Sequence, residues 1–306
     1  MGDRPVERRR RAEMAAEEYG GVISRALLRA ADVDDAMVRR EVIADRWAVH
    51  GARTVAMTRG PLGPLARRWS AVWEVGERIA VVDGASALHH AGMVGYVDEL
   101  VHVSVPHTVS VRRREGIATR KVGTRLPSDA ALPGLPRSRP AVAAVRAAHW
   151  ALSDRQAALL LVLPVQQRLC TGAQLLEAVA EVRGRNRRAF VAAVAADVAG
   201  GAHSLGELDV VDVCRRRGLP PPDRQVVRRL PDGRVYLDVH WDQARLVVEV
   251  DGAGHTRGLA PSDDALRQNA VVLGDDLVLR VPVIGWRLQR DAYLDQIVTA
   301  YAQRTA

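Results

Sequence analysis

The sequence predicts a mixed α/β protein of several domains, because three kinds of pattern follow one another along its 306 residues. The N-terminal part has two short helical patterns followed by an alternating segment around a glycine, and the middle part is largely helical. The C-terminal part alternates like strands between helical segments. A chain of this length favours more than one hydrophobic core. We therefore expect four segments, at residues 1–60, 61–135, 136–203 and 204–306.

The composition is typical of a globular protein. Apolar residues make up 48% of the chain, and no apolar run reaches the roughly 18 residues that a membrane-spanning helix needs. The charged N-terminus is not followed by an apolar stretch, so it does not have the pattern of a secretory signal. The two cysteines, Cys170 and Cys214, are expected to be core thiols. These observations predict a cytoplasmic protein with no membrane partner.

Positive charge is concentrated in the middle of the chain. The net charge is +8, and residues 58–200 carry 19 basic against 11 acidic side chains, whereas residues 1–57 and 201–306 are each close to neutral. Such an excess favours a polyanionic partner, of which nucleic acid is the commonest. The alternative is a coding bias toward arginine, since Lys121 is the only lysine in the protein.

Two capped helices and a hairpin are predicted in the N-terminal segment, after a short polar helix. Ser24 is placed to cap a helix over residues 25–31, and Asp34 to cap a second helix over residues 35–44. Residues 47–57 alternate like two strands joined at a glycine. Helix, turn, helix and hairpin is the layout of a winged helix-turn-helix.

In that fold the second helix enters the major groove of DNA and the wing contacts the backbone. The candidate DNA contacts are the arginines of this segment, namely Arg25, Arg39, Arg40 and Arg46. The alternative is a small helical cap with no DNA role. Acidic residues on and around the second helix favour that alternative, because they weaken the attraction to phosphates.

The middle of the chain is predicted to change from a mixed segment to a helical one. The expected elements of the mixed segment are helices at 64–73 and 85–91, a strand at 100–106 and, at 80–82, either a short strand or the entry to a helix. Residues 128–140 are rich in proline, serine and glycine and predict a linker. Residues 141–200 are predicted to be helical, with Ser153 and Thr171 at capping positions.

The last segment has the predicted order helix, three strands, helix, strand, helix. The expected elements are helices at 204–218, 263–273 and 291–301 and strands at 224–230, 234–241, 246–252 and 277–283. A capping box formed by Ser204 and Glu207 opens the first helix.

Three acidic residues interrupt the apolar strands of this segment. Asp238 and Glu249 lie on strands joined by a tight turn, and Glu249 and Asp251 are two residues apart, so they share one face. Carboxylates that converge in this way repel one another unless a cation offsets the repulsion. Mg²⁺ or Mn²⁺ with oxygen ligands would do so. The alternative is a strand end at which the acids simply face solvent.

The stretch LDVHW…RLVVEVDGAGH…DALRQNAVVLGDDLVLRV resembles an endonuclease-like domain of unknown function that is related to the very-short-patch mismatch-repair endonucleases. That domain belongs to the PD-(D/E)XK nuclease superfamily, and the resemblance covers about residues 204–300. It implies a restriction-endonuclease-like fold in which Asp238 and Glu249, with the carbonyl of Val250, bind the metal. It also implies that Glu207 is the acid of the N-terminal helix.

The chain departs from the general superfamily pattern at one position. Asp251 occupies the place of the superfamily lysine, although this acid fits the subgroup that the chain resembles. With Lys121 the only lysine, no local substitute exists. His255, as a base, and Arg267, as a cation, are the residues expected to compensate in part.

The N-terminal two hundred residues resemble a second family. GGVISRALLRAADV…VRREVIADRW, followed by ASALHHAGM and VHVSVP, is similar to the type IV abortive-infection antitoxins. These carry a winged helix-turn-helix and repress their own operon, and actinobacterial proteins of this size pair the two modules. The resemblance implies DNA and a cognate toxin as partners in a type IV toxin–antitoxin system.

Three functions are therefore open at this point. The first is a magnesium-dependent DNA endonuclease that the N-terminal region delivers to DNA. The second is an antitoxin-type, DNA-binding transcriptional regulator whose nuclease-like domain is inert, as the missing lysine suggests. The third is a protein-interaction module on an α/β scaffold.

Overall fold

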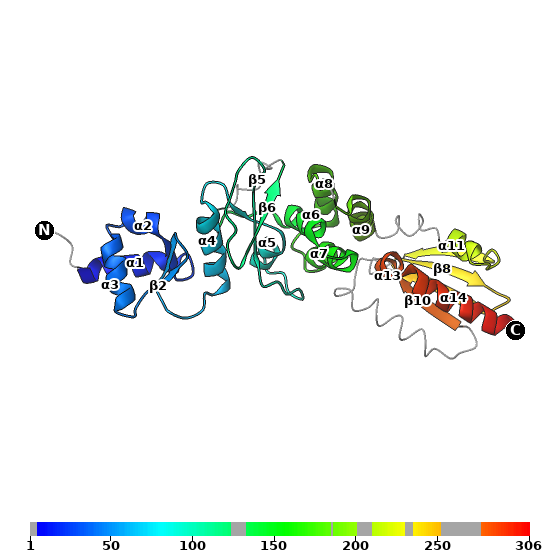
Figure 1. The fold of residues 1–306 in the computed structure, drawn as a ribbon. Coiled ribbons are helices and arrows are strands. Elements are labelled where there is room, and N and C mark those ends of the chain that lie inside the picture. Colours follow the sequence, from blue (N-terminus) through cyan, green and yellow to red (C-terminus); the bar gives the residue numbers. More distant parts are fainter. Residues whose placement is uncertain (1–4, 124–132, 185, 201–209, 230–234, 252–276) are drawn as a thin grey trace. The chain divides into compact units, whose positions relative to one another are not determined.

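A computed structural model describes the chain except for residues 1–4, 124–132, 185, 201–209, 230–234 and 252–276. Helices and strands follow one another along the chain, which confirms the α/β class (Figure 1). The two compact units are Met1–Gly92 with Val97–Arg139, and Met93–Tyr96 with Pro140–Ala306. No helix in the described part of the chain is long and apolar enough to span a membrane.

Three helices and a small sheet form the N-terminal part of the first unit. They are α1 (Pro5–Glu17), β1 (Val22–Ser24), α2 (Arg25–Ala30), α3 (Asp35–Ile43), β2 (Ala48–His50) and β3 (Thr54–Ala56). β3 lies between β1 and β2 and is antiparallel to both. The predicted helices and hairpin are confirmed. The sequence did not predict β1, because three residues are too few to show an alternation.

Both helices of the pair begin at the predicted caps. The Ser24 hydroxyl accepts a hydrogen bond from the backbone N–H of Leu27 at 3.2 Å, and the Asp34 carboxylate accepts one from Met37 at 2.7 Å. These bonds satisfy backbone donors that the first turn of a helix leaves unpaired. The turn between α2 and α3 is therefore defined by local hydrogen bonds.

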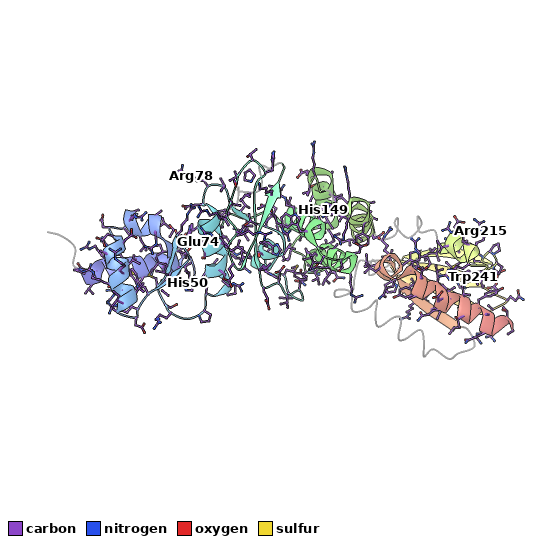
Figure 2. The ribbon with its side chains drawn as sticks, in the orientation of Figure 1. His50, Glu74, Arg78, His149, Arg215 and Trp241 are labelled. Atoms are coloured by element: carbon purple, nitrogen blue, oxygen red, sulfur yellow. The ribbon has the colours of Figure 1, made fainter. Side chains whose placement is uncertain are left out.

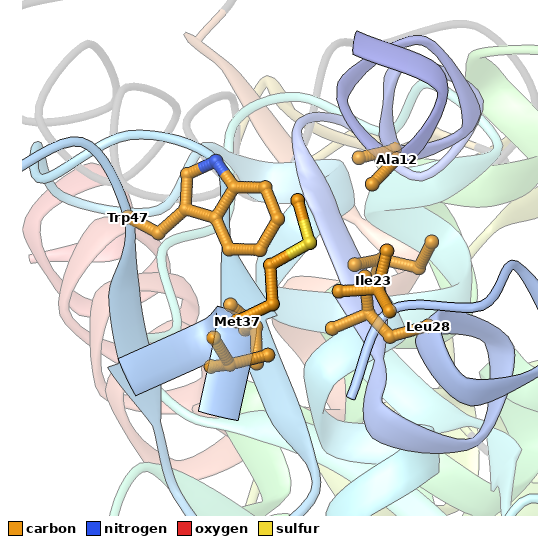
Figure 3. Packing of buried hydrophobic residues seen from close by; sticks show 9 residues of the cluster. Ala12, Ile23, Leu28, Met37 and Trp47 are labelled. Carbon is orange, nitrogen blue, oxygen red and sulfur yellow. The ribbon is translucent and has the colours of Figure 1, made fainter. Parts of the chain in front are cut away.

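One hydrophobic core holds these helices and strands together. It consists of Ala12, Ala16, Ile23, Leu28, Val33, Met37, Val38, Trp47 and Val55, each at most 2% exposed (Figure 3). The largest of them, Trp47, also donates its indole N–H to the Glu13 carboxylate at 3.2 Å. Full burial of one valine, leucine, isoleucine or methionine side chain of this core stabilises the fold by about 1.5–3 kcal/mol. This core therefore holds α3 in place, with the outward face of the helix directed away from the core.

A second small sheet with two helices completes the first unit. Its elements are α4 (Pro64–Val75), β4 (Val81–Val82), α5 (Gly84–His90), β5 (Val101–Pro106) and β6 (Ile117–Val122). β5 is the central strand, antiparallel to β4 and parallel to β6. The sequence predicted α4, α5 and β5 and gave a strand as one of two alternatives at β4, but it did not predict β6. Five of the six β6 residues are at least partly exposed, so this strand lacks the apolar alternation that identifies β5.

A buried carboxylate joins α4 to the tip of the β2–β3 hairpin. Glu74, on α4, is only 6% exposed (Figure 2). Its oxygens accept hydrogen bonds from the backbone N–H groups of Ala52 and Arg53, at 3.0 and 2.6 Å, and from the hydroxyl of Thr54 at 3.1 Å. Hydrogen bonds to an ionised group are stronger than neutral ones. Glu74 therefore fixes the hairpin tip relative to α4.

The second unit begins with four helices. They are α6 (Pro140–Trp150), α7 (Asp154–Gln166), α8 (Gly172–Glu181) and α9 (Arg188–Gly200). Ser153 caps α7, and Thr171 caps α8 in a reciprocal capping box with Gln174. The predicted helical segment and both predicted caps are confirmed.

In its described residues, the rest of the second unit consists of a four-stranded sheet and three helices. They are α11 (Val210–Arg216), β7 (Arg224–Arg229), β8 (Val235–Trp241), β9 (Leu246–Asp251), β10 (Leu277–Pro282), α13 (Val283–Leu288) and α14 (Arg290–Thr305). The sheet order is β10-β9-β8-β7, with β7, β8 and β9 antiparallel in turn and β10 parallel to β9. The four predicted strands are confirmed. The predicted capping box at Ser204 and the predicted helix at 263–273 lie outside the described residues, and α13 was not predicted.

A buried ion pair connects the helical part of the second unit to its sheet. The Asp197 carboxylate, on α9, is fully buried and accepts two hydrogen bonds from the Arg287 guanidinium, of which the Nη2–Oδ1 bond is 2.9 Å long. Leaving one partner of such a pair unmatched is strongly unfavourable. Because α13, which carries Arg287, directly follows β10, the pair fixes the end of that strand.

Replacing Glu74 is expected to destabilise the first unit. Glu74→Ala removes three hydrogen bonds to a buried carboxylate and should lower the free energy of unfolding by about 2–4 kcal/mol. Glu77→Ala is the matched control, since Glu77 is exposed, and it should change stability by less than about 0.5 kcal/mol. Urea unfolding followed by circular dichroism compares the two variants, and equal losses would contradict the anchoring role.

Both cysteines are expected to be unreactive in the folded protein. Burial raises the pKa of Cys170 to about 11 and that of Cys214 to about 12, so both thiols are protonated near neutral pH. Ellman's reagent at pH 8 should find no rapidly reacting thiol in the native chain and two in denaturant. Reactivity should rise only as the pH approaches these pKa values. Rapid modification of native protein at pH 8 would show that a thiol is accessible.

Candidate functional site

The two faces of the C-terminal sheet differ in character. One face is apolar and buried, formed by Leu237, Val239, Trp241, Leu246, Val248, Val250, Leu279 and Val281. α14 contacts β9 and β10 and buries its own apolar residues, so α14 covers this face. The positions between these residues lie on the other face, where Glu249 is partly exposed and Arg280 is exposed. Only that second face can present polar groups to a ligand.

The register brings two of the predicted acids together on this second face. Asp238 of β8 is directly opposite Glu249 of β9. Asp251 lies two residues further along β9, opposite Tyr236, and therefore on the same face. Directly opposed residues of antiparallel strands have Cβ atoms about 4.5–5.5 Å apart. The backbone therefore places all three predicted acids at one end of one face.

Next to these acids lies a cation, Arg280, that the sequence analysis did not identify as part of the site. Arg280 of β10 is directly opposite Glu249, and its Nε lies 3.4 Å from Glu249 Oε2. The side chains of Glu249 and Arg280 are 28% and 67% exposed, so solvent screens much of their attraction. The signal was present in the sequence, since Arg280 interrupts an apolar strand just as Glu249 does.

Part of the predicted site falls outside the described structure. Glu207, His255 and Arg267 lie outside the described residues, and so do the side chains of Asp238 and Asp251. Among the side chains that the structure does describe, no three His, Cys, Asp or Glu residues cluster as metal ligands. The donor set placed by the backbone is nevertheless three carboxylates, which is the chemistry that Mg²⁺ and Mn²⁺ select.

The four predicted DNA-contacting arginines divide into two pairs. Arg25 donates a hydrogen bond of 2.6 Å to Asp35, and Arg46 donates one of 2.5 Å to Glu41. Hydrogen bonds from Arg29 and then from Arg25 lower the pKa of the Asp35 carboxyl. The hydrogen bond to Glu41 raises the pKa of Arg46. Arg25 and Arg46 are therefore already paired within the first unit.

Arg39 and Arg40 are the other pair. Both are exposed, and within the described part of the chain neither has a carboxylate partner. Ala36, Arg39, Arg40 and Ile43 are all exposed. Arg39 and Arg40 lie three and four residues after Ala36 and four and three residues before Ile43, so the four residues form one outward face of α3. Of the predicted arginines, these two are the ones placed to meet an external phosphate.

Comparisons with known proteins add little to this geometry. No protein-family model matches the chain, and no curated protein matches it. Among solved structures the chain is similar to the crystal structure of the RV2827C protein from Mycobacterium tuberculosis, with 16% identity and a TM-score of 0.38, over 61% of this chain and 74% of that one. A similarity of this size carries no argument, so the function rests on the residues described above.

Proposed function

We propose that the C-terminal sheet carries the active site of a metal-dependent DNA endonuclease that hydrolyses phosphodiester bonds. The observation that supports this most directly is the register that sets Asp238 opposite Glu249, with Asp251 on the same face. Carboxylates at this spacing can share one divalent cation. The face that carries these acids is the one opposite the side that α14 covers.

The strand topology supports the same proposal. A helix, three antiparallel strands and a fourth strand parallel to the third are consistent with the restriction-endonuclease-like core that the sequence resemblance implies. The predicted acids lie on the second and third of these strands, β8 and β9. The N-terminal helices and hairpin would then deliver the catalytic domain to DNA as a winged helix-turn-helix.

The residues of the chain have distinct tasks in this proposal. Asp238, Glu249 and the carbonyl of Val250 would hold Mg²⁺ or Mn²⁺, which supplies Lewis acidity toward the phosphate and lowers the pKa of water. Asp251 adds negative charge where a lysine stands in the superfamily pattern. His255 remains the proposed base, and Arg267 a proposed cation.

Loss of Glu249 is expected to abolish cleavage. In the presence of Mg²⁺ or Mn²⁺, the wild-type protein should nick supercoiled plasmid, and Glu249→Ala should reduce the rate more than about 100-fold, because a metal ligand is lost. Asp212→Ala is the control, since Asp212 is an acid of the same unit that pairs with Arg215 on α11. No nicking by wild-type protein with either metal would refute the proposed activity.

A second function is favoured by a different observation. The outward face of α3 carries two arginines that pair with no carboxylate among the described residues, and Asp251 occupies the place of the catalytic lysine. Both features fit a DNA-binding regulator of the antitoxin type, with a toxin protein as partner and an inert nuclease-like domain. In that case promoter binding, and not cleavage, would be the activity of the chain.

The two pairs of arginines allow a matched test of DNA binding. Arg39→Ala with Arg40→Ala should weaken binding to the protein's own promoter about tenfold or more and reduce the slope of log affinity against log salt by about 2, because two phosphate contacts are lost. Arg25→Ala with Arg46→Ala removes the same charge from side chains that are already paired, and should weaken binding less. Gel shifts at several salt concentrations measure both. Equal losses in the two double variants would contradict a contact through α3.

A further inference from the structure

We infer that Arg280 holds Glu249 in the metal-free protein and binds the DNA phosphate once a metal has taken that carboxylate. This inference rests on the proposed nuclease function and adds a residue to it. The sequence resemblance assigned no role to Arg280, and the superfamily pattern places its cation at position 251 instead.

The placement of Arg280 is the first argument. Asp238, Glu249 and Arg280 are consecutive partners across β8, β9 and β10, so they form one row on the face opposite α14. Neighbouring strands lie about 4.8 Å apart, which puts Arg280 one strand from Glu249 and two strands from Asp238. A phosphate beside a metal at the two acids would therefore lie within reach of a long, flexible guanidinium side chain.

The weakness of the ion pair is the second argument. Arg280 is 67% exposed and lies 3.4 Å from Glu249, and exposed pairs of this kind contribute little to stability. The packing of β10 comes from Leu279 and Val281, which are buried on the opposite face. Neither residue requires an arginine between them. Arg280, next to a proposed metal ligand, is exposed enough for a ligand to reach it.

A competing explanation is that Arg280 protects the edge of the sheet. β10 is the outer strand of the described sheet, and charged residues on edge strands discourage pairing with another chain. A protective charge could be a lysine, a glutamate or an arginine with equal effect. Removing such a charge would change the tendency to aggregate, but it would not slow cleavage at a saturating metal concentration.

The two roles of Arg280 predict effects of opposite sign. A cation that pairs with a metal ligand opposes metal binding, because it competes for the carboxylate and repels the ion. The same cation attracts a phosphate and can bind it through two parallel hydrogen bonds. Removing Arg280 should therefore strengthen metal binding and weaken binding of DNA and its cleavage. A residue with only a structural role would weaken all three together.

The charge balance of the site is consistent with this assignment. The only lysine of the protein, Lys121, lies on β6 in the first unit. With an acid at position 251, the face opposite α14 has three carboxylate positions, and Arg280 is a cation placed beside them by the register. It therefore supplies the positive charge that the superfamily pattern assigns to the lysine.

Calorimetric titration with Mn²⁺, on the full chain and without DNA, tests the first role. Arg280→Ala and Arg280→Gln should each bind Mn²⁺ about two- to fivefold more tightly than wild type, which is the range expected when an exposed ion pair no longer competes. Arg280→Lys should bind Mn²⁺ about as wild type does. Asp238→Asn should bind it much more weakly. Circular dichroism checks that each variant is folded, and Arg280→Gln serves where Arg280→Ala does not fold.

Cleavage of supercoiled plasmid at saturating Mn²⁺ tests the second role. Arg280→Ala and Arg280→Gln should cleave at least about tenfold more slowly than wild type, and Arg280→Lys should recover part of the rate, because lysine keeps the charge but not the paired hydrogen bonds.

The outcomes separate this inference from the function on which it rests. If wild type binds Mn²⁺ and Asp238→Asn does not, but the folded Arg280 variants bind it no more tightly than wild type, the role of Arg280 is refuted and the metal site stands. If wild type binds no Mn²⁺, the proposed function fails and the inference fails with it. Tighter Mn²⁺ binding together with unchanged cleavage would also refute the assignment, because the phosphate contact would then be absent.

Discussion

The alternation of β9 between two environments is the constraint on which the candidate site depends. Leu246, Val248 and Val250 are buried beneath α14, and a strand that commits these residues to the core must direct the residues between them to the other face. Glu249 and Asp251 are therefore placed by hydrophobic burial and not by any interaction of their own. A shift of one residue in register would bury both acids, which is far more costly than any gain from pairing them.

The same constraint explains which parts of the site the sequence could predict. The acids interrupt an apolar alternation, so their face and their nearness to Asp238 could be inferred from spacing and a tight turn. Arg280 could not be placed in the same way, because β10 follows a long connection and its register against β9 is set by tertiary packing. The strand that carries Arg280 was predicted, but the pairing of Arg280 with Glu249 was not. Short elements such as β1 were missed because too few residues carry the pattern.

In the N-terminal part, the sequence predicted the elements better than the roles of their side chains. Ser24 and Asp34 act within three residues of their own positions, so capping could be recognised from local sequence. The availability of an arginine depends instead on what lies nearby in the fold. Arg25 is ten residues from its partner Asp35, and only the turn between α2 and α3 brings the two together. Arginines that looked alike in the sequence therefore differ in what they can bind.

Metal binding and turnover would be separable properties of the proposed site, and the charges on the face opposite α14 explain why. Two opposed carboxylates suffice to hold a divalent cation, but hydrolysis also requires positive charge close to the phosphate as negative charge develops there. The negative charge of Asp251 would favour metal binding and disfavour hydrolysis. Arg280 does the reverse, because it competes for Glu249 while the metal is absent and faces the substrate when the metal is bound. The balance between these two residues, one strand apart, therefore decides whether the proposed site binds a metal only or also cleaves DNA.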